Sequence, residues 1–437
     1  MNPLPRTITS ALKRWKSEPH RKVLMIRGAR QVGKTFTVRQ LGEKFEHFLE
    51  VNFDEDKNIH SLFNGNMDVQ KIIQTLAVQY NTPVNPEKTL VFFDEIQACP
   101  DAIRSLRYFY EKIPDLHVVA AGSLLEFALA EIPSFGVGRI QTLFMYPLTF
   151  HEFLTAIHPS LPPLIDAANA ENPLEQSLHH LASDYFKTYQ IIGGMPEVVS
   201  EYSATGDYLK CQQLLDNLIQ SFQTDFAKYK RRYSVQLLRN VFQSVAAQAG
   251  KKFIYGHVAP EMDSKTIKSA LELLIQAGLA YKIPHTSASG LPLGGQINPR
   301  KFKVIPLDPG IYQRLLGLNL KEYFSTDEIR LVNKGSLAEI TAGIQLLHHQ
   351  MPFIQPQLYY WHREAKSSSA EIDYVIQQGD KIVPIEVKAG TKGQMQSMFL
   401  FLKQKNLKYG IRLSMENFSK HGSIYSVPLY AIKSLVV

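Results

Sequence analysis

Eight consecutive residues have the types and spacing needed to hold phosphate groups. Residues 28–35 read Gly-Ala-Arg-Gln-Val-Gly-Lys-Thr, which satisfies the pattern G-x-x-x-x-G-K-T. The two glycines allow successive N–H groups to face the phosphates, and the helix that follows adds the positive end of its dipole. We expect the lysine to reach the β- and γ-phosphates and the threonine hydroxyl to ligate Mg²⁺. The predicted site for ATP and Mg²⁺ is formed by Gly28, Ala29, Arg30, Gln31, Val32, Gly33, Lys34 and Thr35.

Two carboxylates follow a buried apolar run farther along the chain. Leu90 to Phe93 precede Asp94 and Glu95. At the carboxyl end of a parallel strand, Asp94 would lie beside the phosphate loop and hold the metal through its water shell. Glu95 would then orient the water that attacks the γ-phosphate or accept its proton. Two acids after a strand are often only a solvated strand end, but beside a phosphate loop they predict ATP hydrolysis.

Two further polar residues are weaker candidates for the same site. Ser123 follows the apolar run from His117 to Ala121, and it would place a hydroxyl near the attacking water; the alternative is a turn former. Arg139 follows a Gly-Val-Gly segment and would stabilise the transferring phosphoryl group, in its own subunit or in a neighbouring one. The alternative for Arg139 is a solvated or structural arginine.

A third group of charged residues lies near the C-terminus on a predicted β-hairpin. If Gly379 and Asp380 form a two-residue turn, Asp373 lies directly opposite Glu386. Lys388, two residues after Glu386, points to the same face of the sheet. Two carboxylates and a lysine on one face predict a second site for Mg²⁺ or Mn²⁺, with the lysine acting on a water molecule. The alternative is a ladder of cross-strand charge pairs on an exposed hairpin.

The elements that must position the first site alternate between strand and helix. Strands are expected at residues 22–26, 48–53, 90–93, 117–121 and 139–146, with helical stretches between them. Such alternation predicts an α/β fold with a parallel sheet covered by helices. We therefore expect the first domain to comprise residues 1–155.

The middle of the chain is predicted to be helical from about residue 152 to 233, with a turn at 193–196. A helix at 264–277, capped by Asp263 or Ser264 and stopped by Gly278, precedes strands at 279–283 and 302–307. This layout is typical of a winged helix; the alternative is a small helical domain with a hairpin. The predicted second and third domains are residues 156–307 and 308–437, the last being α/β.

Charge is distributed unevenly along the 437 residues, whose net charge is +8. Between Lys228 and Lys303 there are thirteen Lys or Arg against three acids, which predicts a surface for DNA or RNA; a solvated surface is the alternative. Two cysteines cannot form a disulfide framework. No signal peptide or membrane-spanning run is recognisable, so the expected location is the cytoplasm, with no membrane partner.

The C-terminal pattern resembles the PD-(D/E)xK nuclease signature. Asp373 is followed by Glu386-x-Lys388, and Glu339 in the predicted helix 335–347 matches the acid that many such enzymes carry on a preceding helix. The order helix, strand, hairpin, helix, strand also fits. The resemblance implies that Glu339, Asp373 and Glu386 are metal ligands and that Lys388 is catalytic. In this chain Ile372 replaces the proline that precedes the aspartate.

The whole chain resembles a family of bacterial and archaeal AAA+-like ATPases with a restriction-endonuclease-like C-terminal domain of unknown function. The segments that carry this resemblance are residues 28–35, 90–97, 122–123, 138–139, 146–153, 193–196, 371–373 and 384–388. The family implies ATP binding and a winged-helix element between the two ends. Many AAA+-type proteins form rings in which an arginine serves the neighbouring subunit, so a homo-oligomer is a further expectation.

Two functions remain open from the sequence. The first is an ATP-hydrolysing enzyme that acts on nucleic acid and carries a metal-dependent nuclease-like domain. The second is an ATP-gated regulatory or binding protein whose nuclease-like domain does not cut.

Overall fold

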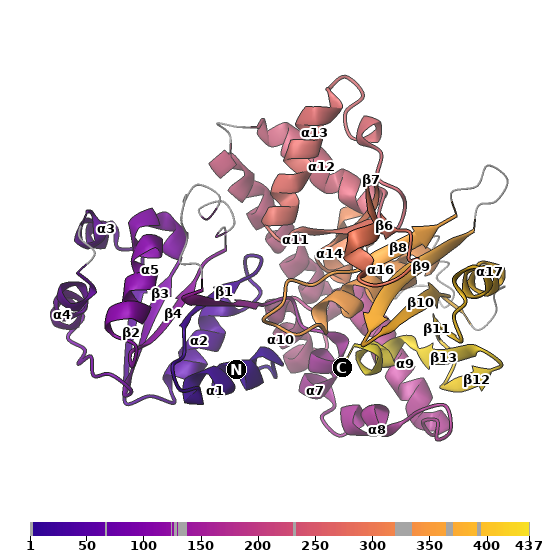
Figure 1. The fold of residues 1–437 in the computed structure, drawn as a ribbon, viewed down its shortest axis with the longest axis horizontal. Coiled ribbons are helices and arrows are strands. Elements are labelled where there is room, and N and C mark those ends of the chain that lie inside the picture. The colour runs from indigo at the N-terminus through magenta and orange to yellow at the C-terminus, as the bar shows by residue number, and fades with distance from the viewer. Residues whose placement is uncertain are drawn as a thin grey trace.

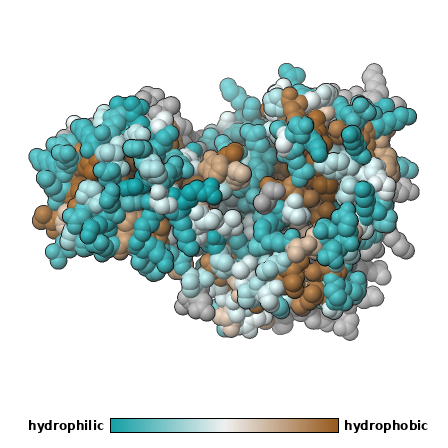
Figure 2. Space-filling view, turned by 60° about the horizontal axis from the view of Figure 1, so that its bottom comes forward, coloured by the Kyte–Doolittle hydropathy of each residue, from teal (hydrophilic) through white to brown (hydrophobic). Residues whose placement is uncertain are grey.

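The structure is a computed structural model that describes residues 3–65, 68–123, 125, 129, 138–229, 233–319, 334–363, 370–390 and 395–436. The chain forms two lobes, and the smaller one holds the N-terminal strands (Figure 1). The space-filling view shows the same two lobes, with a mostly hydrophilic visible surface on the smaller one (Figure 2). The mixed α/β fold class predicted from the sequence is confirmed.

The smaller lobe is built on a five-stranded sheet in the order β2-β3-β4-β1-β5. All neighbouring strands in it run parallel, as the strand and helix alternation predicted. The strands are β1 (Val23–Arg27), β2 (His47–Asn52), β3 (Thr89–Asp94), β4 (His117–Ala121) and β5 (Ile140–Phe144).

Helices cover both faces of this sheet because its strands are apolar on both sides. In β1, Val23 and Met25 face one hydrophobic core, whereas Leu24 and Ile26 face another core that continues into the larger lobe. The helices of this lobe are α1 (Ile8–Ser17), α2 (Lys34–Gly42), α3 (His60–Phe63), α4 (Val69–Gln79) and α5 (Pro100–Lys112). Short 3₁₀ turns occur here at Lys57–Ile59 and Ile96–Ala98, and in the larger lobe at Phe226–Tyr229, Tyr255–His257, Leu293–Gln296 and Leu429–Leu435.

A helical region follows, as predicted. It contains α7 (Phe150–Ile157), α8 (Leu161–Ala167), α9 (Gln176–Ile192), α10 (Pro196–Thr205), α11 (Tyr208–Asp225), α12 (Val235–Ala247) and α13 (Ser264–Gln276). The predicted cap of α13 is confirmed, since the side chain of Asp263 accepts hydrogen bonds from two backbone N–H groups and Gly278 follows with φ +74°. No helix in the described ranges is both long and apolar enough to cross a membrane.

The larger lobe contains an eight-stranded mixed sheet in the order β12-β13-β11-β10-β9-β8-β6-β7. Strands β6 (Ala280–Thr286) and β7 (Ile297–Pro306), predicted as the wing of a winged helix, pair with each other and join this sheet through β8. The other strands are β8 (Tyr359–His362), β9 (Glu371–Gln378), β10 (Lys381–Val387), β11 (Gly410–Ser414), β12 (Ser419–His421) and β13 (Ile424–Pro428). The helices are α14 (Pro309–Leu315), α16 (Lys334–His348) and α17 (Gln396–Lys405).

The predicted turn at residues 193–196 joins α9 to α10 and receives a buried carboxylate. Asp308 accepts a hydrogen bond from the N–H of Gly194 at 2.6 Å and also caps α14. A Cβ on Gly193 would lie 2.0 Å from an Asp308 oxygen, and one on Gly194 would lie 2.0 Å from the carbonyl oxygen of Leu148. Glycine is therefore required at both positions.

Candidate functional site

The phosphate-loop octet lies between β1 and α2, the context that its mechanism requires. Gly28 packs against the segment after β5, where an added Cβ would lie 2.1 Å from the carbonyl oxygen of Met145. Gly33 has φ +95° and precedes the first residue of α2. Gly28 has no room for a side chain, and Gly33 adopts a backbone conformation that other residues rarely adopt, so glycines at both positions let the backbone curl around a phosphate group.

Lys34 is buried at the centre of this loop. Its ammonium donates hydrogen bonds to the carbonyl oxygens of Gly28 at 3.0 Å and Ala29 at 2.7 Å. Burial lowers the pKa of Lys34 to about 8, although the neighbouring carboxylates of Glu95 and Asp94 oppose this change. A buried cation at the centre of the loop is well placed to attract phosphate oxygens.

Thr35 and Asp94 meet as expected for a Mg²⁺ site. The Thr35 hydroxyl donates to a carboxylate oxygen of Asp94 at 2.8 Å, and the N–H of Glu95 donates to the other oxygen at 3.0 Å. Burial raises the pKa of Asp94, whereas the bond from Thr35 lowers it. A hydroxyl and a carboxylate side by side fit Mg²⁺, which prefers oxygen ligands and usually binds one or two carboxylates together with phosphate and water.

Glu95 is oriented by two polar side chains. Its backbone is left-handed, with φ +47°, and the Gln97 amide donates to Glu95 Oε2 at 2.5 Å. The Ser123 hydroxyl donates to the same oxygen at 3.3 Å. Ser123 was a candidate from the sequence, whereas Gln97 was not, and its position two residues after Glu95 was the only available signal.

A cavity of about 450 Å³ opens beside these residues, within the size range of small-molecule sites. Both lobes contribute to it, because the start of α10 forms part of its wall. Its lining residues are Leu4, Arg6, Arg30, Gln31, Gly33, Lys34, Thr35, Phe36, Thr37, Arg39, Glu95, Ser123, Pro196, Glu197 and Ser200.

The remaining loop residues tie the octet to the rest of the protein. Arg30 forms an ion pair with Asp225 at the end of α11, with a nitrogen–oxygen distance of 2.6 Å. Val32 is fully buried, and its carbonyl oxygen accepts a hydrogen bond from Arg6 at 2.9 Å. Gln31 has φ +66°. The loop is thus linked directly to a helix of the larger lobe, which the sequence did not reveal.

The position of Arg139 does not fit a role at its own phosphate loop. It precedes β5, whose first residue Ile140 pairs with Val23 at the start of β1, whereas the loop follows the end of β1. Four residues of strand, about 13 Å, separate these two edges of the sheet. Arg139 forms an ion pair with Glu111 of α5. This position does not favour action at its own loop, and the role of Arg139, in its own subunit or in a neighbouring one, stays a prediction.

Only some of the cations in the basic segment from Lys228 to Lys303 are exposed at the surface. Lys251 and Lys252 are exposed, and Lys282 pairs with Glu272 at 2.8 Å. Lys303 is 2% exposed and cannot contact a nucleic acid. Residues 230–232 of this segment lie outside the described residues. Residues 136 and 137, which precede Arg139 in the sequence, also lie outside them.

The C-terminal hairpin has the predicted register. Ile385 pairs with Tyr374, and Lys381 with Gln378 across the turn. This register sets Asp373 opposite Glu386, and a carboxylate oxygen of Asp373 accepts a hydrogen bond from the N–H of Val387 at 2.7 Å.

Lys303 enters this carboxylate cluster from β7. Its ammonium bonds a carboxylate oxygen of Glu339 at 2.8 Å and one of Glu371 at 2.5 Å. Burial lowers the pKa of Lys303, but Glu339, Glu371 and Asp373 raise it above its ordinary value. Burial likewise raises the pKa of Glu339.

The prediction that Glu339, Asp373 and Glu386 jointly hold a metal ion is not supported. Within the described part of the chain, no three His, Cys, Asp or Glu residues are grouped as metal ligands would be. The physical reason is that Glu339 is engaged by the ammonium of Lys303. This role of Lys303 was not predicted from the sequence, where Lys303 counts among the cations of the basic segment.

Glu386 and Lys388 form the other half of the cluster. The ammonium of Lys388 bonds Glu386 Oε1 at 2.7 Å. Glu386 Oε2 is buried and has no hydrogen-bond partner among the described residues. Burial and the nearby carboxylate of Asp373 raise the pKa of Glu386.

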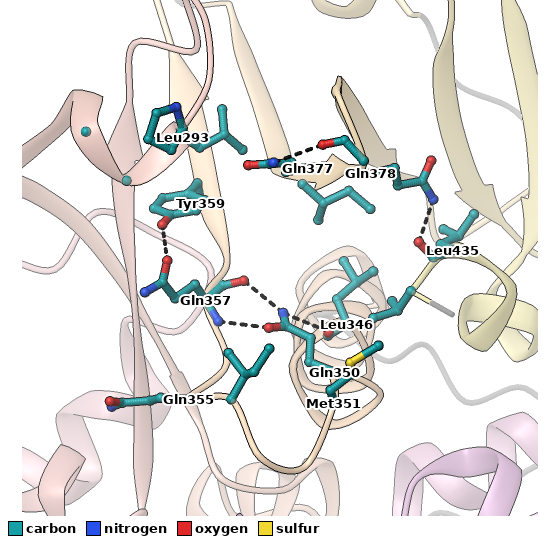
Figure 3. A pocket seen from close by; sticks show the side chains of 17 residues that line it. Leu293, Leu346, Gln350, Met351, Gln355, Gln357, Tyr359, Gln377, Gln378 and Leu435 are labelled. Carbon is teal, nitrogen blue, oxygen red and sulfur yellow. Dashed lines mark hydrogen bonds between the residues drawn. The ribbon is translucent and has the colours of Figure 1, made fainter. Parts of the chain in front are cut away.

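A larger cavity, of about 1000 Å³, lies in the larger lobe (Figure 3). Every described residue that lines it is uncharged, and five of these residues are glutamines. The Gln350 side chain donates to the carbonyl oxygen of Gln357 at 2.8 Å, and the Tyr359 hydroxyl donates to the Gln357 side chain at 2.5 Å. Without a lining cation, this cavity is not suited to phosphate groups, in contrast to the cavity beside Lys34.

Three family models match separate parts of the chain. Residues 20–154 match the AAA domain, residues 183–322 match a domain of unknown function (DUF8612), and residues 334–432 match another (DUF4143). The first match and the parallel sheet around the phosphate loop make the N-terminal part an AAA-like ATPase domain. The model matching the C-terminal part assigns no activity to it.

The comparisons that span most of the chain find only distant similarity. An uncharacterized protein of Haemophilus influenzae is 22% identical over 386 residues, which cover 84% of this chain and 82% of that protein. The Walker-type ATPase paby2304 of Pyrococcus abyssi has a TM-score of 0.45 and 14% identity, covering 72% of this chain and 96% of its own. The Aeropyrum pernix ORC1 protein, solved in complex with DNA, has a TM-score of 0.28 and 11% identity, covering 73% of this chain and 92% of its own.

Proposed function

We propose that this chain, whose residues 20–154 form an AAA-like ATPase domain, hydrolyses ATP with Mg²⁺ and uses it to act on nucleic acid. The observation that carries the ATPase proposal is the meeting of Thr35, Asp94 and Glu95 beside the buried Lys34. Mg²⁺, when bound, neutralises the phosphate charge that develops during transfer.

Each residue has a separate task in this proposal. Lys34 binds the β- and γ-phosphates, while Thr35 and Asp94 hold the metal. Glu95 orients the attacking water and accepts its proton, a role that suits a carboxylate oriented by Gln97 and Ser123. The backbone N–H groups of the octet complete the cradle.

Phosphate release tests this assignment. Lys34→Ala should fail to bind ATP, whereas Glu95→Gln should bind ATP and hydrolyse it at least about a hundredfold more slowly. Glu55→Gln removes an exposed carboxylate of the same lobe and should leave the rate unchanged. A Glu95→Gln protein that hydrolyses ATP as fast as the wild type would remove Glu95 from the mechanism.

Nucleic acid is the proposed partner because exposed cations gather in the middle segment. Lys251 and Lys252 are exposed and precede α13, which we propose as the recognition helix of a winged-helix element. We also propose that the chain assembles with copies of itself, so that Arg139 serves the neighbouring nucleotide site. Mass measurement with and without ATP tests the assembly.

The proposed division of labour follows three segments of the chain. Residues 1–155 bind and hydrolyse ATP, residues 156–307 grip the partner, and residues 308–437 form the nuclease-like part. The cytoplasm is the proposed location, which fits the two free thiols of Cys99 and Cys211. In the nuclease version of this proposal, Asp373 and Glu386 hold a second Mg²⁺ or Mn²⁺ and Lys388 acts on water.

A second candidate function is favoured by the ion pairs of Lys303 with Glu339 and Glu371. Here the C-terminal part keeps a nuclease-like arrangement without cutting, and the chain is an ATP-gated binding or regulatory protein. Incubation of DNA and RNA with purified protein and Mg²⁺ or Mn²⁺ separates the two. Cleavage that disappears in Asp373→Asn would establish the nuclease, and no cleavage by the wild type favours the regulator.

A further inference from the structure

The ammonium of Lys303 occupies a position that is costly for a lone cation. The side chain is 2% exposed and comes from β7, yet its nitrogen reaches Glu339 on α16 and Glu371 on β9. Moving an ammonium out of water costs several kcal/mol, so it stays charged in such a place only when anions surround it. The nitrogen also lies 5.2 Å from the centre of the Tyr360 ring, whose face attracts cations.

The carboxylates of this cluster come from three different elements. Glu339 lies on α16, Glu371 and Asp373 lie on β9, and Glu386 lies on β10. Carboxylate oxygens are the ligands of compact hard cations, but with the ammonium in place no three described acids are grouped as metal ligands would be. A lysine ammonium is also a compact, strongly hydrated point charge, so it can take the electrostatic place of such a cation.

The cluster still has binding capacity that Lys303 does not use. Glu386 is 7% exposed, and its Oε2 atom is buried without a hydrogen-bond partner among the described residues. The four carboxylates outnumber the two ammonium groups, those of Lys303 and Lys388. A buried, unpaired carboxylate oxygen is unfavourable, and a cation that reached it would remove this cost.

We propose that Lys303 is a built-in cation that competes with a divalent metal ion for the Glu339, Glu371, Asp373 and Glu386 cluster. The wild-type cluster therefore binds Mg²⁺ or Mn²⁺ weakly, and removal of the ammonium converts it into a metal site. This inference deepens the second candidate function, because it states what holds the carboxylates together without a metal. It does not depend on ATP hydrolysis.

Calorimetric titration of the full-length protein with Mn²⁺, without nucleotide, tests the competition. All proteins carry Asp94→Asn so that the nucleotide site contributes no metal ligand from β3. Lys303→Met should bind Mn²⁺ at least about tenfold more tightly than the parent, since it removes a positive charge from the place of the ion. Equal affinity of the two proteins would overturn the proposal.

Lys388→Met is the matched control. It removes the same charge from the same cluster, but the Lys388 side chain is 25% exposed and its ion pair among the described residues is with Glu386. Its Mn²⁺ affinity should rise less than about threefold, because solvent screens exposed charges. A gain equal to that of Lys303→Met would show a general charge effect and contradict the proposal.

A second pair of variants covers the case in which Lys303→Met does not fold. Glu371→Gln is compared with Glu371→Gln/Lys303→Met, in which one positive and one negative charge are removed together. The double variant should again bind Mn²⁺ more tightly than the single one, and Mn²⁺ should raise its Tm. The absence of both effects would overturn the proposal. Neither Mn²⁺ affinity nor Tm depends on activity towards ATP or nucleic acid. A negative result in these measurements is therefore distinguishable from failure of the proposed function.

Discussion

Replacing Lys34 by methionine should stabilise the ligand-free protein while abolishing ATP binding. Lys34 is 7% exposed, and burial lowers its pKa from 10.5 to about 8. At 1.36 kcal/mol per pKa unit, keeping this ammonium charged at pH 7 costs about 3 kcal/mol of folding stability. Methionine avoids that cost but leaves the carbonyl oxygens of Gly28 and Ala29 without their bonds, at about 1 kcal/mol each. The expected net gain is about 1 kcal/mol.

The pH dependence separates the buried charge from other effects of the substitution. Because the folded pKa of Lys34 lies below the unfolded value, the unfolded chain binds more protons between pH 8 and pH 10.5. The unfolding free energy of the wild type should therefore rise across this window by up to about 3 kcal/mol relative to the variant. Urea unfolding of both proteins at pH 7 and pH 10, followed by circular dichroism, measures the difference. Equal changes of unfolding free energy in the two proteins would refute the assignment of a buried charged Lys34. In a separate measurement, ATP should raise the Tm of the wild type but not that of the variant.

Three further predictions follow from single contacts. Gln97→Leu should lower kcat about tenfold with little change in the KM for ATP, because Gln97 only orients Glu95; a change confined to KM in a phosphate-release assay would contradict this. The double change Lys251→Ala/Lys252→Ala should weaken nucleic-acid binding and reduce its salt slope by about two, as measured by fluorescence anisotropy; an unchanged slope would exclude both lysines from the interface. Burial lowers the pKa of His117 to about 4, so its contribution to stability is complete above pH 6.5 and is lost as the pH falls towards 4. His117→Gln should therefore lose up to about 3 kcal/mol less unfolding free energy than the wild type between pH 7 and pH 4.5, and equal losses would argue against a buried neutral histidine.

Local patterns in the sequence were sufficient to predict the features whose chemistry and conformation depend on residues that are neighbours in the chain. The octet at 28–35 predicted a strand, a loop and a helix because its glycines and its Lys-Thr pair serve one function together. The register of the C-terminal hairpin could be predicted because a two-residue turn at Gly379 and Asp380 leaves one pairing for the flanking strands. The side-chain cap of α13 by Asp263 is a local interaction of the same kind.

Contacts between distant segments could not be predicted in this way. Lys303 was counted as a surface cation because its place in the chain does not reveal that β7 joins the sheet carrying Glu371. The position of Arg139 depends on the edge of the sheet at which β5 begins. Its ion pair with Glu111 depends on how α5 packs against the sheet. The link from Arg30 to Asp225 spans 195 residues of sequence. Each of these contacts is set by tertiary packing and not by spacing along the chain.

A single-turnover experiment on Glu95→Gln tests whether Lys34, Thr35, Asp94 and Glu95 form an ATP-hydrolysing site. Excess protein is mixed with radiolabelled ATP and Mg²⁺, quenched over time, and the bound nucleotide is separated into ATP and ADP. We expect the wild type to convert its bound ATP to ADP while Glu95→Gln retains intact ATP over the same period. Conversion at equal rates in the two proteins, or no ATP bound by either, would contradict this expectation.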